Sequence, residues 1–253
     1  MRGAQFDRHA AELVRTRIDV IMAGGDAALE AAQRATSEIP ILALTDDMVG
    51  KRFVKSLAKP GGNTTGVTIL ASELDGKRQA ILIEAVPGVR RIAALVDAGT
   101  SSASHVSALE EEARAAGVEL SAHQVSRAED IGPALERVRL SGAKALNVLA
   151  SSLLFNNRTI ILDRVAALRL PTIYQWPEMA MQGGLIGYGP SIVQLYRDVQ
   201  SRQLVRLLKG DKPADLPVEQ PTKFELAVNL TTAKALDITI PPSLLSLADE
   251  VIE

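Results

Sequence analysis

The chain has 253 residues, of which 47% are hydrophobic and 23% charged, and its formal net charge is −2. This balance is ordinary for a globular protein and excludes the broad positive field that recruits nucleic acid or an anionic membrane. Aromatic residues make up 3% of the chain, which argues against a stacking surface for single-stranded nucleic acid. We therefore expect no nucleic-acid partner.

The chain contains no cysteine, which excludes disulfide bonds, thiol catalysis and thiolate metal sites. Its three histidines are His9, His105 and His123, and none is followed by a second ligand at the spacing of a metal site. No run of about 18 apolar residues occurs, so the sequence predicts no membrane span. We expect neither a metal nor a cofactor.

Apolar periodicity predicts alternating helices and strands in the first part of the chain. Residues 5–16 carry apolar side chains at helical spacing, and residues 18–23 are typical of a strand buried on both faces. A break at Pro60-Gly61-Gly62 follows. The other elements predicted here are a helix over 26–35, a strand over 39–44, a helix over 50–57 and a turn over 59–68.

The same rhythm starts again with a helix over 75–85. The predicted strands that follow are 91–96, 118–124, 143–150 and 171–174, and the predicted helices between them are 104–116, 128–139 and 156–168. The last predicted elements are a Gly-rich segment over 183–190, a helix over 192–208, an extended segment over 223–228 and a helix over 231–236. Strands that alternate with helices predict parallel sheets, here in two doubly wound lobes that divide near residue 70.

The turn after the first strand reads Ala-Gly-Gly-Asp-Ala-Ala-Leu over residues 23–29. A dinucleotide site needs a third glycine at fixed spacing, and a Walker loop needs Gly-Lys followed by Ser or Thr. The sequence has neither, so we do not expect a phosphate here. Asp26 is then either the cap of its own helix or a partner for a ligand amine.

The carboxyl ends of the predicted strands carry hydroxyls, amides and carboxylates. Ligands of open α/β sheets bind beyond these ends, where helix N-termini also present N–H groups. The pattern predicts a site for a small polar ligand, although Ser, Thr and Asp at such turns are also typical helix caps. The candidate ligand-binding residues are Gly25, Asp26, Thr45, Asp46, Asp97, Thr100, Ser101, Ser151, Ser152, Tyr174, Trp176, Glu178 and Tyr188.

Three of these candidates are aromatic, namely Tyr174, Trp176 and Tyr188, and they fall near a predicted lobe boundary. Aromatic rings at such a place fit stacking on a ligand in a cleft. Packing in the core or at a hinge is the alternative interpretation of the same residues.

An enzyme is the main alternative to a binding protein. The sequence lacks the Gly-x-Ser-x-Gly turn of an α/β hydrolase. An enzyme that acts on a small metabolite could use Asp46, Asp97 or Glu178, but nothing marks any of them as a general acid. A ligand-sensing regulator would need a DNA-binding helix-turn-helix, which the sequence does not show. We therefore expect no catalysis.

Four strings carry a more specific signal, namely KPGGNTTGVT (59–68), ELDGKRQAILIEAVPGVRRIAAL (73–95), GGLIGYGP (183–190) and PADLPVEQPTKFELAVNLTTAKALDITIPPSLLSLADEVIE (213–253). With them the chain resembles the bacterial ABC transporter substrate-binding protein family, whose better-known members resemble tryptophan and tyrosine binding proteins. The resemblance extends over essentially the whole chain.

The resemblance implies the type I periplasmic-binding-protein fold, which has two Rossmann-like lobes and three hinge crossings. Gly and Thr residues at the crossings would suit a hinge rotation. The implied first lobe is 1–69 plus about 187–219, and the implied second lobe is 70–186 plus about 220–253. The implied crossings are about 65–72, 183–190 and 219–229.

The resemblance also implies the solute-binding component of an ABC importer, whose ligand binds between the lobes, favours the closed state and is delivered to a membrane permease. By the same analogy the ligand is an aromatic amino acid or a related small carboxylate; a branched-chain amino acid, a nucleoside or an aromatic acid stays open. Trp176 and Tyr188 would stack on its ring, and Asp26 or Asp46 would meet an amine. The carboxylate would bind helix N–H groups and the hydroxyls of Thr100, Ser101, Ser151 and Ser152.

Family members begin with a signal peptide, a strand, a helix and a second strand, and this chain starts after them, at QFDRHAAELV (5–14). The first lobe would then lack its initial strands, and its open strand edge would favour a dimer. The resemblance implies a periplasmic location. The chain as given shows no signal peptide and would be cytoplasmic if this is its true start.

Overall fold

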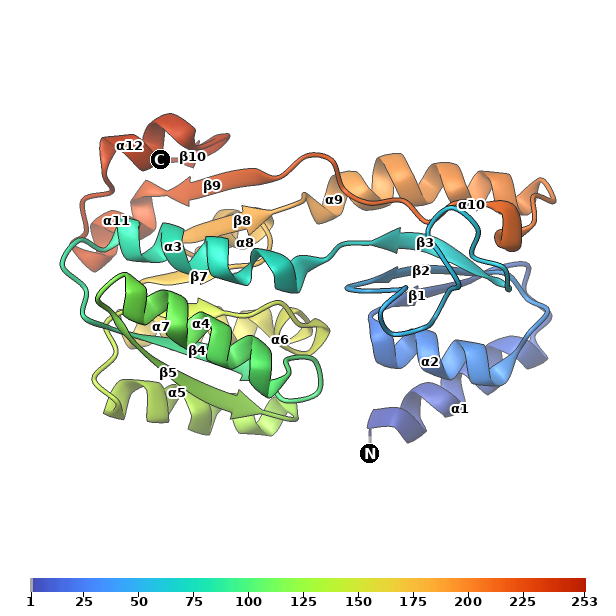
Figure 1. Cartoon of the computed structure of the whole chain (residues 1–253), viewed down its shortest axis with the longest axis horizontal. Coiled ribbons are helices and arrows are strands. Elements are labelled where there is room, and N and C mark those ends of the chain that lie inside the picture. Colours follow the sequence, from blue (N-terminus) through green and yellow to red (C-terminus); the bar gives the residue numbers. More distant parts are fainter. Residues whose placement is uncertain (1) are drawn as a thin grey trace. The chain divides into compact units, whose positions relative to one another are not determined.

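The computed structural model describes residues 2–253 and divides them into two compact units. Unit 1 comprises the chain up to Leu70 together with Ile192–Lys223 (Figure 1). Unit 2 comprises Ala71–Ser191 together with Phe224–Glu253. The chain therefore passes from one unit to the other three times.

The three passages lie close to the crossings expected from the sequence. The first and third fall within the predicted ranges 65–72 and 219–229. The second falls just after the predicted range 183–190, which lies wholly in unit 2. Residues 187–191, predicted for the first lobe, accordingly belong to unit 2, and residues 220–223 belong to unit 1.

Unit 1 is built on a parallel three-stranded sheet in the order β1-β2-β3. Strand β1 lies at one edge of this sheet, and the dimer predicted through an open edge stays a prediction. The elements of unit 1 are α1 (Arg2–Arg15), β1 (Ile21–Gly24), α2 (Asp26–Ala35), β2 (Ile41–Thr45), β3 (Thr64–Thr68), α9 (Ile192–Gln194), a π-helical segment (Leu195–Gln200), α10 (Ser201–Leu208) and a 3₁₀ turn (Pro213–Asp215).

The central strand β2 is buried on both faces, as its apolar sequence predicts. Ile41 packs in one cluster with Leu29 of α2, and Leu42 packs in another with Leu207 of α10. Helices α2 and α10 therefore cover opposite faces of the sheet, as Figure 1 shows. This layering is that of a Rossmann-like lobe.

Two sequence-based predictions in unit 1 are wrong. Residues 50–57 form turns and bends rather than a helix, with Phe53 N and Val54 N both donating to the Met48 carbonyl. Arg52 has a positive φ of 61°, which an α-helix does not contain. The second half of the predicted turn over 59–68 is the strand β3, which forms a parallel ladder with β2.

Unit 2 contains a seven-stranded sheet in the order β10-β9-β8-β7-β6-β4-β5. All of its neighbouring strands are parallel except the antiparallel pair β8–β9. Its elements are a 3₁₀ turn (Ala71–Leu74), α3 (Asp75–Ala85), β4 (Arg91–Asp97), α4 (Ala103–Ala115), β5 (Glu119–Val125), a 3₁₀ turn (Ala128–Asp130), α5 (Ile131–Leu140), β6 (Leu146–Val148), α6 (Ser152–Asn156), α7 (Arg158–Ala167), β7 (Thr172–Tyr174), α8 (Glu178–Met181), β8 (Ile186–Gly189), β9 (Glu225–Asn229), α11 (Leu230–Leu236), α12 (Pro242–Leu247) and β10 (Glu250–Ile252).

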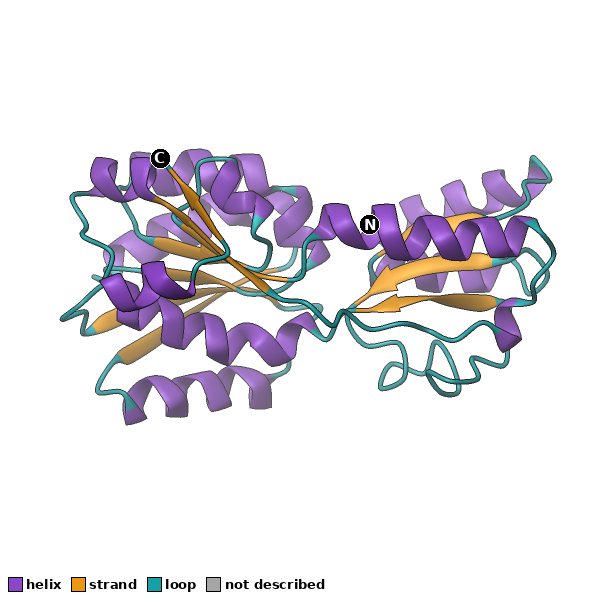
Figure 2. Cartoon of the chain, turned by 90° about the horizontal axis from the view of Figure 1, so that it is seen from above, coloured by secondary structure: helices purple, strands orange, loops and turns teal. Residues whose placement is uncertain are grey.

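Helices cover both faces of this sheet, as the view from above shows (Figure 2). Ala94 and Val96 of β4 pack with Val106 of α4, whereas the alternate residues Ala93 and Leu95 are equally buried. Side chains that alternate along a strand point to opposite faces, so β4 contributes to two core layers. The sheet is therefore doubly wound, as the sequence predicts.

The differences from prediction in unit 2 are local. The Gly-rich segment 183–190 contains the strand β8. The helix predicted over 156–168 is present as α7, and the short helix α6 before it was not predicted. Helix α12 and strand β10 were not predicted, because each is short. Strands β8 and β10 widen the sheet, and they do not change where the predicted strands end.

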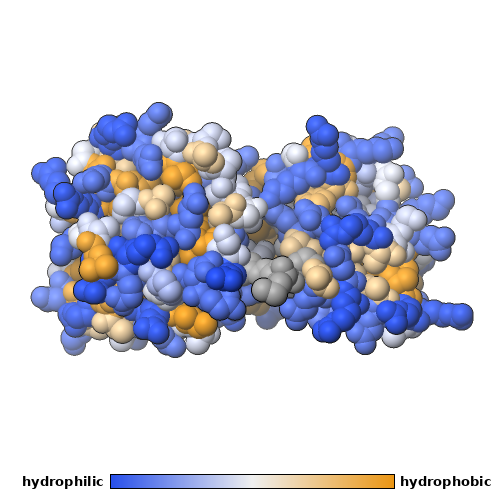
Figure 3. Space-filling view, turned by 90° about the horizontal axis from the view of Figure 1, so that it is seen from below, coloured by the Kyte–Doolittle hydropathy of each residue, from blue (hydrophilic) through white to orange (hydrophobic). Residues whose placement is uncertain are grey.

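On the face drawn in Figure 3, apolar side chains form small separate patches among hydrophilic ones in each unit. Within residues 2–253, none of the helices combines the length and the apolar character that crossing a membrane requires.

Candidate functional site

The carboxyl edge of the unit 1 sheet holds one ion pair. Gly25 follows β1 with φ 85°, and Asp26 starts α2. The Asp26 carboxylate accepts a hydrogen bond from the Thr45 hydroxyl and pairs with the Lys51 ammonium. The N-cap position of α2 belongs to Gly25, and Asp26 is the first residue inside the helix. Of the two interpretations of Asp26, that of a cap for its own helix is therefore wrong, because its carboxylate contacts the end of β2 and the loop that follows.

Thr45 and Asp46 form the end of β2 at the same edge. Thr45 is buried, which explains why its hydroxyl bonds to a carboxylate rather than to solvent. The Asp46 carbonyl accepts hydrogen bonds from Leu70 N at 2.9 Å and from the Thr68 hydroxyl at 2.7 Å. Four of the predicted residues, Gly25, Asp26, Thr45 and Asp46, thus lie at one edge of one sheet.

The carboxyl edge of unit 2 is more deeply buried. Asp97 ends β4, and its carboxylate accepts a hydrogen bond from the Ser151 hydroxyl at 2.6 Å and from Gly99 N at 2.9 Å. Ser151 also caps α6 by accepting from Leu153 N at 3.0 Å. Asp97 and Ser151 are each 6% exposed. The two residues therefore join the ends of β4 and β6.

The remaining predicted hydroxyls lie on the rim of this edge. The Thr100 and Ser101 amides donate to the Asp97 carbonyl at 3.1 and 3.0 Å, which holds the turn after β4. The Thr100 side chain is exposed, and Ser152 is exposed at the start of α6. The Thr100 hydroxyl donates to the Asp97 carbonyl at 3.4 Å, and the Ser151 hydroxyl donates to the Asp97 carboxylate.

Two of the predicted aromatic residues are buried. Tyr174 is fully buried beside Gly184, where a Cβ would lie 2.6 Å from the tyrosine ring, and its burial raises the pKa of the phenol. This position is typical of a core side chain. Trp176 is 4% exposed and packs edge-on against Phe155 at 5.8 Å. Within the described residues its indole N–H has no hydrogen-bond partner, so Trp176 keeps an unused donor.

Glu178 and Tyr188, the last two candidates of unit 2, have different partners. The Glu178 carboxylate accepts from the Ser191 hydroxyl at 2.6 Å. Tyr188 packs against the main apolar cluster of unit 2, and its carbonyl accepts from Arg78. A stacking role for Trp176 or Tyr188 stays a prediction, as does binding between the two lobes.

Sequence reasoning missed Asp75, Arg78 and His105. The Arg78 and Asp75 side chains are 0% and 1% exposed and form an ion pair of 2.7 Å. The second Asp75 oxygen contacts His105 Nε2 at 3.1 Å. The i,i+3 spacing of Asp75 and Arg78 was visible, but it is also typical of a pair on a solvated helix face. Only their burial distinguishes the two cases.

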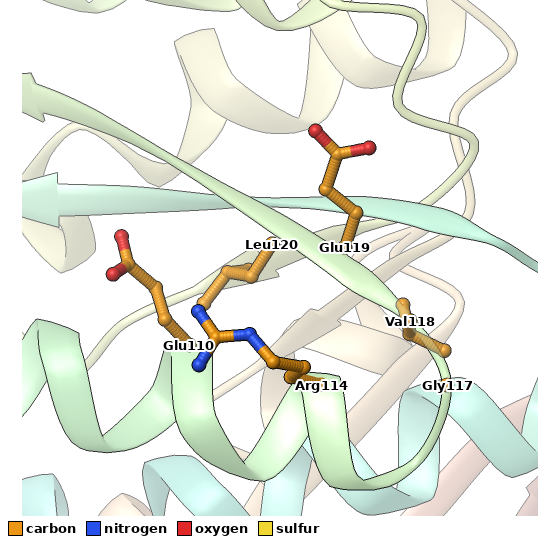
Figure 4. Close-up of a pocket in the computed structure, with 6 residues that line it drawn as sticks. All are labelled: Glu110, Arg114, Gly117, Val118, Glu119 and Leu120. Carbon is orange, nitrogen blue, oxygen red and sulfur yellow. The ribbon is translucent and has the colours of Figure 1, made fainter.

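Two surface depressions of unit 2 are lined by residues other than the candidates. One of about 480 Å³ lies at the turn from α4 to β5, where Arg114 and Glu110 line it (Figure 4). It faces the amino end of β5, opposite to the edge where ligands of such sheets bind. A second of about 280 Å³ includes His105 and lies between α3 and α4. Within residues 2–253, no group of three or more acidic or His side chains could hold a metal ion.

Comparisons with known proteins agree with this architecture. The family model described as ABC transporter substrate binding protein matches residues 5–252. A tyrosine-binding protein of Clostridioides difficile (strain R20291) is 26% identical over 233 residues, which are 90% of this chain and 66% of that protein. The chain thus spans just under two thirds of the length of this relative.

Solved structures share the fold. An ABC domain in complex with L-Trp from Streptococcus pneumonia is 25% identical, with a TM-score of 0.83 over 99% of this chain and 86% of that chain. A conserved domain protein from Vibrio cholerae is 23% identical, with a TM-score of 0.86 over 98% of this chain and 83% of that chain. The predicted type I periplasmic-binding-protein fold is confirmed, and the chain belongs to the ABC transporter substrate binding protein family.

Proposed function

We propose that this protein captures an aromatic amino acid, or a related small carboxylate, and delivers it to the permease of an ABC importer. The family match over residues 5–252 carries this proposal. The choice of an aromatic amino acid comes from two similar proteins, one named a tyrosine-binding protein and one solved in complex with L-Trp. Delivery to a permease and a periplasmic location are part of the same proposal, and the family match supports both.

The rim of unit 2 supplies the groups that we propose for the ligand carboxylate. The hydroxyls of Thr100 and Ser101 stand between β4 and the N-terminus of α4, a 13-residue helix whose first N–H groups favour an anion. Ser152 adds an exposed hydroxyl at the neighbouring strand end. Asp97 and Ser151 hold this rim in place through their mutual hydrogen bond.

In unit 1 we propose Asp46 as the contact for a ligand amine. Asp26 is the second candidate, and its carboxylate pairs with the Lys51 ammonium. The unused indole N–H of Trp176 supports a polar contact near the rim of unit 2. None of these roles requires a bond in the ligand to break, so we expect binding without turnover.

Thermal unfolding with candidate ligands tests the proposal. A ligand that binds only the folded state at about a hundred times its Kd adds about 2.7 kcal/mol of stability. We expect L-tryptophan or L-tyrosine to raise the melting temperature, and nucleosides to leave it unchanged. The double substitution Thr100→Ala and Ser101→Ala should weaken affinity about tenfold, which is about 1.4 kcal/mol.

Ser107→Ala is the matched control, because Ser107 is an exposed hydroxyl further along α4. It should leave the affinity unchanged. Chemical conversion of the bound amino acid by the purified protein would favour the enzyme alternative. An unchanged melting temperature with every aromatic amino acid would contradict the proposed ligand class.

A further inference from the structure

Arg78 contacts three backbone carbonyls that are far apart in the sequence. Its Nε donates to the Tyr188 carbonyl at 2.8 Å, one Nη donates to the Ala71 carbonyl at 2.8 Å, and the other reaches the Gln175 carbonyl at 3.5 Å. Tyr188 belongs to β8, Gln175 follows β7, and Ala71 is the first residue of unit 2. One buried side chain therefore holds three segments of unit 2 together.

Asp75 connects the same guanidinium to the loop after β6. The Asp75 carboxylate accepts from Arg78 at 2.7 Å and from Ala150 N at 3.2 Å. The Gln175 amide group donates to the Ser151 carbonyl at 3.2 Å. Since Ala150 and Ser151 are adjacent, these contacts close a ring through Asp75, Arg78 and Gln175. The ring fixes the loops after β6 and β7 relative to each other.

The ring also connects to the proposed ligand rim. Ser151 donates its hydroxyl to Asp97, whose carbonyl holds the turn that carries Thr100 and Ser101. Trp176 follows Gln175 directly in the sequence. A shift of the Arg78 guanidinium would therefore displace the Thr100 and Ser101 hydroxyls and the Trp176 indole. No contact between Arg78 and a ligand is needed for this effect.

Stability alone does not explain a buried ion pair at this place. The loss of water around both charges offsets much of their attraction, and an apolar side chain of similar volume stabilises a core at least as well. A guanidinium instead offers a planar set of donors in fixed directions, and its charge strengthens its hydrogen bonds to carbonyls. What Arg78 adds is a fixed geometry.

We infer that Arg78 is a positioning residue for solute binding: it holds the loops after β6 and β7 in the geometry that the ligand needs and touches no ligand itself. Its full burial and its hydrogen bonds to protein carbonyls separate this role from that of a cation that binds the ligand carboxylate. The inference rests on the proposed function and concerns unit 2 alone.

Two substitutions at this position test the inference. Arg78→Lys keeps the charge but replaces the planar donors by a single ammonium, and Arg78→Met removes both. Lys77→Met is the matched control, because it removes an exposed charge from the neighbouring position of α3. All variants are measured as full chains, at a temperature below the onset of unfolding of the least stable one.

Trp176 provides a readout that needs no ligand. It is the single tryptophan of the chain, so acrylamide quenching of the intrinsic fluorescence reports on the loop after β7. We expect quenching to increase at least twofold in Arg78→Met and less in Arg78→Lys. In calorimetric titrations with L-tryptophan and L-tyrosine, the affinity of both variants should fall at least tenfold. Lys77→Met should change neither quantity.

A purely structural role predicts a different pattern. The melting temperature of the Arg78 variants would fall, while quenching and affinity of the folded proteins would match those of the unchanged chain; that result would overturn the inference. If Arg78→Met does not fold, Arg78→Lys decides by the same two readouts. If the unchanged chain binds neither amino acid, the proposed function fails, and the quenching of Trp176 alone decides whether Arg78 positions the loop.

Discussion

Both units order polar groups at the carboxyl edge of a parallel sheet, but they do so through different interactions. In unit 2 the groups are buried and connected: Asp75 and Arg78 are almost inaccessible, and Asp97 bonds to Ser151. In unit 1 the Asp26–Lys51 pair is partly exposed and joins one strand end to a loop. Buried polar networks fix one geometry, whereas an exposed pair is screened and adjustable.

The sheets differ in the same sense. The three-stranded sheet of unit 1 is completed by side chains from its C-terminal helical segment, since Gln200 donates to the Ala43 carbonyl and Gln203 donates to the Gly66 carbonyl. The seven-stranded sheet of unit 2 has a larger apolar core of its own. We therefore expect unit 1 to depend on a few close backbone contacts and unit 2 to depend on its core and its polar network.

Gly66→Ala should have the largest effect. Gly66 has φ 141°, and a Cβ there would overlap the backbone oxygen and nitrogen of Ala43 in the neighbouring strand. Such a clash between two strands should destabilise unit 1 by about 3 kcal/mol or more. Differential scanning calorimetry should show this loss in one part of the unfolding profile. Gly62→Ala is the control, because a Cβ there meets nothing within 4 Å; equal profiles for both variants would contradict the account of unit 1.

Asp97→Ala should have the next largest effect, in unit 2. It leaves the Ser151 hydroxyl and Gly99 N without their buried acceptor, which costs about 2–3 kcal/mol. Urea unfolding measures this loss. Asp163→Ala removes an exposed carboxylate from α7 and should change the stability by less than about 0.5 kcal/mol. If the two substitutions proved equally mild, the network of unit 2 would not be important for its stability.

Asp26→Asn removes the carboxylate charge that pairs with Lys51 and tests how much this partly exposed pair stabilises unit 1. The Lys51 side chain is 33% exposed, so losing its partner should cost only about 0.5–1 kcal/mol. Because exposed pairs are screened, the cost should shrink further between 0.05 M and 1 M salt. Urea unfolding at both salt concentrations checks this. A loss as large as that of Asp97→Ala would show that the unit 1 edge is as rigid as the unit 2 edge.

His123 gives the smallest effect. Partial burial, with the nearby Arg137 cation, lowers the pKa of His123 from its ordinary value of 6.5. The pKa of His123 is lower in the folded than in the unfolded state, so protonation favours unfolding. The protein keeps its full stability above about pH 6.5 and loses the contribution of His123 as the pH falls through the lowered pKa. His123→Gln should weaken this acid dependence, and NMR titration of the imidazole should give a midpoint below that of a denatured control.

The fold could be predicted from the sequence because its strands are apolar on both faces and its helices are periodic. Strands such as β2 and β4 are apolar on both faces, so they are buried inside a parallel sheet that helices cover on both sides. The helix expected over 50–57 failed because local propensity was overridden by turns around Gly50 and Arg52. Strand β8 was not expected because glycine is a weak strand former, and its pairing with β7 and β9 is non-local.

The candidate site could be predicted only in part. Polar residues at strand ends, such as Asp97 and Ser151, were found by position along the chain. The Asp75–Arg78 pair was missed because a buried and a solvated pair have the same i,i+3 spacing on a helix. Tyr174 was included because its place at the end of a strand resembles that of a ligand contact, while Gly184 packs so closely on its ring that a Cβ would not fit. Burial is a property of the tertiary structure, and one sequence does not specify it residue by residue.

Isothermal titration calorimetry of the full chain with L-tryptophan and L-tyrosine measures whether this protein binds an aromatic amino acid. We expect saturable binding of at least one of them with one site per chain, recovery of the unaltered amino acid, and an affinity about tenfold weaker in the Thr100→Ala and Ser101→Ala double variant. Absence of binding heat for both amino acids with a folded protein, or binding that the double variant leaves unchanged, would contradict the proposed ligand class or the proposed site, respectively.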